Sequence, residues 1–330
     1  MKNIAIIGAG IAGLTLANKL KGKYDVTVFE KSRGVGGRMA TRYADDYQFD
    51  HGAQYFTAKS PEFIEFVEKL KNEGVIDIWN ARFVELDGNK ITKEHVWDEN
   101  APHLLAIPKM NQIGKYLAQG IKTNVNCHID SLVRYNNEWK IFNNEGVCVG
   151  TYDYIVSAIP PEQADELIFD NVKFKHDLPQ YQMSACFSLM LGFKTPKDLP
   201  FEAALVNNQD ISWISVNSSK PDRPKGYSIL VHSTNQWADS NIESDIEWVR
   251  SHMIKQLEHV TQVKMTDHDY INIHRWKYAN IGQQDGPKFL EDKKNSIAAI
   301  GDWLIKGKVE SAFTSAISLY EYRFKGKKND

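Results

Sequence analysis

The sequence predicts an α/β fold that begins with a parallel strand–helix–strand unit, and three observations predict it. An apolar run, Ile4–Ile7, leads into the glycine-rich stretch Gly8-Ala9-Gly10-Ile11-Ala12-Gly13. A second apolar run, Val26–Phe29, follows after a stretch long enough for a helix. Glu30 closes that second run, 17 residues after Gly13. This arrangement is typical of the first unit of a dinucleotide-binding fold.

The glycines, the helix and the acid of this unit each have a physical task. Gly8 makes the tight turn out of the strand, and Gly13 lets the helix pack close to the sheet. Gly10 has no Cβ, so the backbone there can approach a pyrophosphate. The helix N-terminus at Ala12 offers free N–H groups and a positive dipole end to the phosphates. Glu30 can accept both ribose hydroxyls of an adenosine, and an acid here disfavours a 2′-phosphate.

A second glycine-rich loop follows Glu30 directly and reads Lys31-Ser32-Arg33-Gly34-Val35-Gly36-Gly37-Arg38. A simple NAD dehydrogenase would continue from its acid to another helix and strand. Gly36 and Gly37 allow close backbone approach, and Arg38 can pair with a phosphate through its planar guanidinium. The loop therefore favours FAD over NAD, and an ordinary loop with a surface arginine is the alternative.

Helices and strands are expected along the rest of the chain. Ser60, as a cap, and Pro61 predict the start of a helix that Gly74 ends. Further helices are expected at 110–118, 246–260 and 309–322, and strands at 129–135, 139–143, 152–159, 270–275 and 297–300. The basic end, Arg323–Lys328, is expected to be a solvated tail.

The length of 330 residues allows two hydrophobic cores. We predict a discontinuous cofactor domain at 1–74, 108–164 and 281–330. An α+β substrate domain, built on a mostly antiparallel sheet, is predicted at 75–107 and 165–280.

Composition restricts the classes of function. The net charge of −2 gives no electrostatic case for a nucleic-acid or membrane partner, and no apolar run reaches the length of about 18 residues of a membrane span. Three cysteines without a Cys-x-x-Cys pair predict a reduced, cytoplasmic protein without disulfides or a metal site. A signal peptide is the alternative interpretation of the N-terminus, but three glycines interrupt its apolar stretch. The sequence predicts no oligomeric state.

Four segments resemble known flavoenzymes. The two glycine loops with Glu30 resemble the FAD-binding Rossmann-like fold of the glutathione-reductase and amine-oxidase type. Asp50-His51-Gly52-Ala53-Gln54-Tyr55-Phe56-Thr57 and His274-Arg275-Trp276-Lys277-Tyr278-Ala279 resemble elements of the bacterial renalase-like group of the flavin amine oxidase superfamily. Ala299–Trp303 and Gly307–Phe313 resemble its C-terminal flavin motif, although Ser311 stands where that family commonly has glycine.

The resemblance implies noncovalent FAD and an oxidase that passes hydride from a flat small molecule to flavin N5 and then electrons to O2, giving H2O2. The implied substrates are the isomeric 2- and 6-dihydro forms of NAD(P), which such enzymes return to NAD(P)+. An amine oxidase or desaturase with another substrate is the first alternative, and a non-catalytic FAD-binding redox protein is the second. The implied flavin contacts are Lys31, Gly36, Gly37, Arg38, Gly52, Ala53, Gln54, Gly301, Asp302, Glu310, Ser311 and Ala312.

Four residues are candidates for catalysis: His51, Gln54, Trp276 and Tyr278. Trp276 and Tyr278 share one face of an extended segment and can cover a flat substrate, with core packing as the alternative. His51 is a candidate proton donor or a solvated loop residue. Arg275 can pair with a substrate phosphate or a surface acid. No cysteine is near Trp276 in the sequence, so we expect no covalent flavin link.

Overall fold

The computed structural model describes residues 2–326, and its two largest sheets in that range have six and seven strands. The six-stranded sheet is parallel except for one edge strand and has the order β19-β20-β13-β1-β2-β9. Its strands are β1 (Asn3–Ile7), β2 (Asp25–Phe29), β9 (Lys122–Asn124), β13 (Tyr154–Ser157), β19 (Leu290–Asp292) and β20 (Ile297–Ala299). The fold is thus α/β, as predicted.

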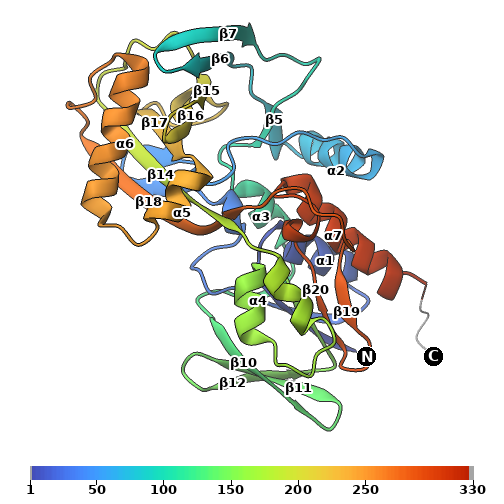
Figure 1. Cartoon of the computed structure of the whole chain (residues 1–330). Coiled ribbons are helices and arrows are strands. Elements are labelled where there is room, and N and C mark those ends of the chain that lie inside the picture. Colours follow the sequence, from blue (N-terminus) through green and yellow to red (C-terminus); the bar gives the residue numbers. More distant parts are fainter. Residues whose placement is uncertain (1, 327–330) are drawn as a thin grey trace.

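Both faces of the six-stranded sheet are covered, because β1 and its neighbours alternate their apolar side chains between two cores. Ile4 and Ile6 face α1 (Ile11–Leu20) and α7 (Val309–Arg323), which lie together in Figure 1. Ile7 faces the opposite core, which includes α4 (Pro161–Leu167) and the three-stranded meander. The meander consists of β10 (Ile129–Tyr135), β11 (Glu138–Asn143) and β12 (Cys148–Tyr152).

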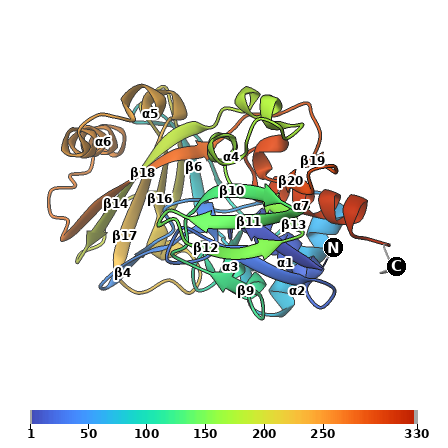
Figure 2. The same ribbon diagram turned by 90° about the horizontal axis from the view of Figure 1, so that it is seen from below.

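The seven-stranded sheet is antiparallel except between β15 and β6, and its order is β18-β14-β17-β16-β15-β6-β7. Two helices, α5 (Asn235–Asn241) and α6 (Ile246–Thr261), pack on one face of it (Figure 2). Its strands are β6 (Arg82–Asp87), β7 (Lys90–Val96), β14 (Ser184–Phe193), β15 (Ala203–Asn207), β16 (Ile211–Val216), β17 (Tyr227–Ser233) and β18 (Tyr270–Asn280).

A small hairpin crosses the other face of the seven-stranded sheet. It consists of β3 (Arg42–Ala44) and β4 (Tyr47–Phe49). Tyr47 and Phe49 pack on Met190 and Leu230 of the sheet. A segment from the N-terminal part of the chain is thereby fixed against strands that occur more than 130 residues later.

The remaining elements connect these layers. They are α2 (Pro61–Asn72), α3 (Gln112–Leu117), the pair β5 (Ile76–Ile78) and β8 (Leu104–Ala106), and the short 3-10 helices η1 (Gly37–Met39), η2 (Lys175–Gln180), η3 (Asn217–Ser219) and η4 (Asp302–Leu304). No helix within residues 2–326 is long and apolar enough to cross a membrane. Strands from the two predicted domains form separate sheets, and the domain boundaries themselves stay a prediction.

The predicted helices are confirmed, with some differences in detail. The predicted strand 152–159 is wrong as one unit, because Asp153 separates the end of β12 from β13. β18 extends beyond the predicted 270–275, because it pairs with the long strand β14. The predicted tail is also wrong in part, since Arg323 ends α7 beside Glu291 and Phe324 is buried. Its last residues, Lys327 and Lys328, lie outside the described range.

Gly13 tests the packing of α1 on the sheet. A Cβ at Gly13 would lie 2.1 Å from the carbonyl oxygen of Gly8, so the helix would have to move. We expect Gly13→Ala to lower the free energy of unfolding by roughly 1–3 kcal/mol, despite the higher helix propensity of alanine. Urea denaturation of the cofactor-free protein measures this change.

Gly10→Ala is the matched control, because a Cβ at Gly10 has no neighbour within 4 Å. Its unfolding midpoint without cofactor should stay close to that of the wild type. A Gly13→Ala protein as stable as Gly10→Ala would contradict the close packing described for α1.

Candidate functional site

A cleft of about 1750 Å³ lies between the six-stranded and seven-stranded sheets. It is lined by both glycine loops, by the start of α7, and by residues of β14, β16, β17 and β18. Pockets for single drug-sized ligands have volumes of about 300–1000 Å³. The cleft therefore has space for a dinucleotide and a second molecule.

The first glycine loop presents a helix N-terminus to the cleft. Gly8 has a φ of 107°, which only glycine adopts readily, and α1 begins after Gly10 without a side-chain cap. A Cβ at Gly10 would project into open space, as a residue that faces a ligand should. The second loop packs on the first, since Gly36 N–H donates to the carbonyl of Ala9 and Gly37 lies against Gly10. The two loops form one cradle that could hold phosphate groups.

Glu30 lies at the end of β2, where its carboxylate is held by the backbone. One oxygen accepts the N–H of Ala9 at 2.9 Å and the other accepts the N–H of Ser32 at 2.8 Å. The side chain is buried yet lines the cleft. A carboxylate has about four acceptor sites, so two remain for hydroxyl groups. This geometry fits the predicted contact with a ribose.

Arg38 and Asp302, both predicted to contact a cofactor, form an ion pair at the cleft. Arg38 Nη1 donates to Asp302 Oδ2 at 2.9 Å, and Nη2 contacts Oδ1. Nη1 also donates to the carbonyl of Ala279 at 3.1 Å, which connects the glycine loop to the end of β18. About a third of the Arg38 side chain stays exposed, so its remaining N–H groups can still reach an anion.

The start of α7 is a second uncapped helix N-terminus at the cleft. Lys308, Val309 and Ala312 line the cleft, and the helix has no side-chain cap. A ligand group that gains negative charge would be stabilised there. The hydroxyl of Ser315 accepts the N–H of Gly301, which fixes the turn before Asp302.

Two predicted residues of α7 do not reach the cleft. Glu310 accepts the N–H groups of Lys59 and Ser60, the two residues just before α2, and the hydroxyl of Ser60 makes no capping hydrogen bond. Ser311 is buried but is absent from the cleft lining, and so is Gly13. These residues support the site from behind.

The opposite end of the cleft has an aromatic wall. His274, Trp276 and Tyr278 alternate along β18 and line the cleft, as strand geometry requires of residues two apart. The Trp276 ring stacks on His51 with centroids 5.2 Å apart, and its Nε1 donates to the His51 carbonyl at 2.8 Å. His274 meets His51 edge-on at 4.9 Å. The wall can hold a flat molecule.

His51 is neutral at physiological pH. Burial, with smaller contributions from His274 and Arg42, lowers its pKa to about 3. The pKa values of His232 and His274 fall to about 4, chiefly through burial. A histidine this hard to protonate is a poor proton donor at pH 7. The geometry therefore favours a packing and hydrogen-bonding role for His51 over the predicted proton transfer.

Gln54 lies behind the wall and is not part of the cleft lining. Its amide nitrogen donates to the carbonyls of Asp50 and Gly52, and its oxygen accepts from Ser215 at 2.9 Å and Lys220 at 3.2 Å. All of these contacts hold the loop 50–54 in shape. Gln54 therefore positions the loop, and the structure does not bring it to the place of a reacting molecule.

Asp50 anchors the same loop through buried charge. Its carboxylate contacts Arg223 at 2.6 Å and Lys220 at 3.6 Å, with all three side chains fully buried, and it accepts from Thr41 and Met110. Burial alone would raise the pKa of Asp50, but Lys220 and Arg223 lower it and the net shift is downward. Burial lowers the pKa of Lys220 to about 8.

Cys186 is close to Trp276 in space, although no cysteine lies near Trp276 in the sequence. The two are directly paired on β14 and β18, and both line the cleft. The sequence separation of 90 residues concealed this contact. Burial raises the pKa of the Cys186 thiol to about 12, so it stays protonated and weakly nucleophilic. The thiol is therefore poorly suited to forming a covalent link.

Most of the predicted site residues line the cleft. Further residues line it that no sequence motif indicated. Arg42 and His232 line it, but neither belongs to a recognised motif. His274 belongs to the segment 274–279 that resembles a flavoenzyme element. Its spacing of two residues from Trp276 could have indicated that both side chains share one face of a strand. The predicted residues that line the cleft are Gly8, Gly10, Ala12, Glu30, Lys31, Gly36, Gly37, Arg38, His51, Gly52, Ala53, Trp276, Tyr278, Gly301, Asp302 and Ala312.

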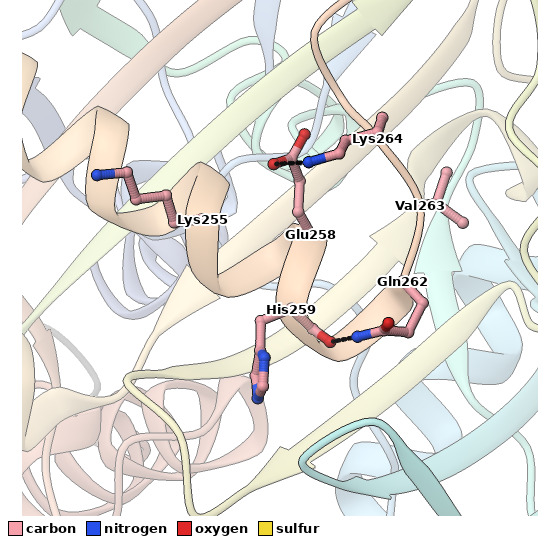
Figure 3. Close-up of a pocket in the computed structure, with 6 residues that line it drawn as sticks. All are labelled: Lys255, Glu258, His259, Gln262, Val263 and Lys264. Atoms are coloured by element: carbon pink, nitrogen blue, oxygen red, sulfur yellow. Dashed lines mark hydrogen bonds and ion pairs between the residues drawn. The ribbon is translucent and has the colours of Figure 1, made fainter.

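A smaller hollow of about 320 Å³ lies at the C-terminal end of α6 (Figure 3). Gln262 there adopts the left-handed conformation, and its side chain donates to the carbonyl of His259. Lys264 pairs with Glu258 at 3.7 Å. These contacts terminate α6, and the hollow is the space left beside the end of that helix. The cleft between the two sheets is therefore the candidate site.

The comparisons with known proteins agree with this geometry. Residues 6–70 match the family model of an NAD(P)-binding Rossmann-like domain. A 1-hydroxycarotenoid 3,4-desaturase of Flavobacterium sp. (strain P99-3) is 36% identical over 104 residues. That similarity covers 30% of this chain and 19% of the desaturase, so the chain matches about a fifth of the length of this relative.

Solved structures extend the similarity to the whole chain. A protein of Exiguobacterium sp. 255-15 assigned as a protoporphyrinogen oxidase has a TM-score of 0.78 at 11% identity and covers 97% of this chain and 98% of its own. Cyclohexylamine oxidase from Brevibacterium oxydans IH-35A has a TM-score of 0.71 at 12% identity, with coverages of 97% and 99%. The chain has the fold of these oxidases.

The buried ion pair gives a prediction for the loop 50–54. Arg223→Met should leave Asp50 poorly compensated and lower the free energy of unfolding by on the order of 3 kcal/mol at pH 7. Removing the cation raises the pKa of Asp50, so the loss should shrink as the pH falls and the carboxyl becomes neutral. Urea denaturation at pH 7 and pH 4.5 measures both effects.

Arg82→Met is the control, because Arg82 forms an exposed pair with Glu202 and its loss should cost less than about 1 kcal/mol. Equal losses for the two variants, or a loss that grows at low pH, would contradict the role given to Arg223.

Proposed function

We propose that the cleft binds FAD noncovalently. Three features support this cofactor: the cradle of two glycine loops, the carboxylate of Glu30, and a second helix N-terminus at α7. The adenosine would lie at Glu30, the pyrophosphate at the cradle beside Arg38, and the flavin between α7 and the aromatic wall. The open space at Gly10 is where a phosphate needs to approach the backbone.

Glu30→Gln tests the cofactor. An amide cannot accept both backbone N–H groups, and it loses the charge that favours ribose hydroxyls. A charge-assisted hydrogen bond of about 1.5–3 kcal/mol corresponds to roughly a 10- to 150-fold rise in the Kd for FAD. Titration of cofactor-free protein by flavin fluorescence gives this value.

Glu310→Gln is the matched control, because Glu310 holds the backbone before α2 and lies outside the cleft lining, and its Kd should stay near that of the wild type. Acid or heat denaturation of the wild-type protein should release unmodified FAD into solution. A protein that cannot be loaded with FAD would refute the proposed cofactor, and flavin retained after denaturation would refute only noncovalent binding.

We further propose that the protein is an oxidoreductase that oxidises a flat small molecule at the aromatic wall. Bound FAD would supply a two-electron acceptor that takes a hydride at N5 and passes the electrons to O2, which leaves as H2O2. The stacked pair of Trp276 and His51 supports this proposal most directly, because it faces the place of the flavin and can align a planar ring.

The charges at the cleft favour a dihydropyridine nucleotide over an amine. Eight lysines and arginines line the cleft against four aspartates and glutamates, and none of these acids comes from the seven-stranded sheet. A protonated amine would meet no carboxylate of that sheet among the described lining residues, whereas a nucleotide carries negative phosphates. The products of 2- or 6-dihydroNAD(P) oxidation would be NAD(P)+ and H2O2. An amine oxidase with a neutral substrate is the second candidate, supported by the shared fold.

The substrate prediction rests on alignment at the wall. We expect 2- or 6-dihydroNAD(P) to bleach the flavin rapidly under anaerobic mixing, and ordinary NADH and monoamines to do so slowly. Moving the reactive hydrogen to another ring carbon shifts it by about 1 Å or more, which can cost roughly 10²-fold in rate. Stopped-flow absorbance of the flavin measures the rates.

Trp276→Ala should lower this rate far more than it lowers the FAD content, because Trp276 belongs to the aromatic wall and not to the phosphate cradle. Rapid bleaching by a simple amine, with none by the dihydro isomers, would favour the amine oxidase alternative. Reduction by neither class would refute both proposed substrates.

A further inference from the structure

Arg42 is a cation at the cleft without a protein partner. It lies on β3, next to the hairpin residues that pack on the seven-stranded sheet, and it is half-buried. Its guanidinium makes no ion pair and no hydrogen bond with any residue in the range 2–326. The neighbouring arginines differ, since Arg38 pairs with Asp302 and Arg275 donates to the carbonyl of Ser244 at 2.8 Å.

Two histidines of the cleft lie within reach of the charge of Arg42. Its positive charge is close enough to His51 and His274 to lower the pKa of both. The Nδ1 atom of His51 is buried without a hydrogen-bond partner, on a side chain only 6% exposed. A buried polar atom without a partner carries a free-energy cost, so a ligand that completes it gains affinity.

We propose that Arg42, with His51 and His274, binds a negatively charged oxygen group, a carboxylate or a phosphate, of the molecule held at the aromatic wall. This inference rests on the proposed function, and it adds that the substrate is an anion bound through its own charged group. The planar guanidinium pairs with two oxygens at once, which a lysine cannot do. The stacked rings of His51 and Trp276 hold the flat part of the same molecule.

A cation or a neutral molecule fits this place less well. A cation would face Arg42 without a carboxylate from the seven-stranded sheet among the described lining residues. A neutral molecule would leave the guanidinium without an anionic partner. Neutral histidines each provide one N–H, so they can donate to an anion without the repulsion that further charges would bring.

Calorimetric titration with benzoate and with inorganic phosphate tests the proposal on the purified full chain. Benzoate is a flat carboxylate, inorganic phosphate represents the other source of charge, and benzamide is a neutral molecule of nearly the same shape. We expect Arg42→Met to weaken binding of the preferred anion by about 10- to 100-fold and to leave benzamide binding nearly unchanged. The anion affinity of Arg42→Lys should lie between those of the wild type and of Arg42→Met.

Arg82→Met is the control, because it removes the same charge from an arginine outside the cleft lining, where Arg82 pairs with Glu202. Its anion affinity should stay near that of the wild type. Preference for benzoate would assign a carboxylate, and preference for phosphate would assign a phosphate.

Wild-type protein that binds neither anion, or an Arg42→Met protein that binds both as tightly as the wild type, would overturn the proposal. The heat of anion binding is read without turnover, and the FAD content of each sample is measured separately by absorbance. Failure to bind FAD would therefore refute the proposed function, while the benzoate and phosphate titrations would still decide the role of Arg42.

Discussion

The carbonyl oxygen of His51 is the point on which the geometry of the cleft depends. It accepts hydrogen bonds from Ser188, His232 and Trp276, which belong to three different strands of the seven-stranded sheet. Two residues later, the N–H of Ala53 donates to the carbonyl of Arg38 in the glycine loop. One short loop thus connects the phosphate cradle to the aromatic wall. The spacing between a bound dinucleotide and a second molecule follows from this loop.

Buried charge holds the loop, and its contribution is to geometry more than to net stability. Taking Asp50 and Arg223 out of water costs several kcal/mol per ion, which their attraction and hydrogen bonds roughly offset. Apolar side chains of similar volume could give equal stability. They could not, however, fix the position of Asp50 through four directional partners at once. We infer that the ion pair is retained because a shift of the loop would misalign the wall with the cradle.

The sequence predicted what local rules determine, and it missed what distant contacts determine. Gly8 and Gly13 could be interpreted because a turn and a close helix contact have local signatures. Glu310 was assigned to the cofactor, yet it accepts the backbone N–H of Ser60, 250 residues earlier in the chain. Arg42 has no local signature, and only the packing of its hairpin on the seven-stranded sheet brings it to the cleft. A single sequence holds little information on such pairings.

The same separation explains how this fold can serve different substrates. In the proposed binding mode the cradle and Glu30 would contact phosphate and ribose, groups that every dinucleotide carries, so this half of the cleft need not vary with the second molecule. The other half includes side chains on β14, β16, β17, β18 and the β3–β4 hairpin, which can change without disturbing the cradle. In this chain that half contains Arg42 and three neutral histidines but no carboxylate from the seven-stranded sheet. The shared fold is thus consistent with the proposed dinucleotide, and on our proposal the charge at Arg42 selects the second molecule.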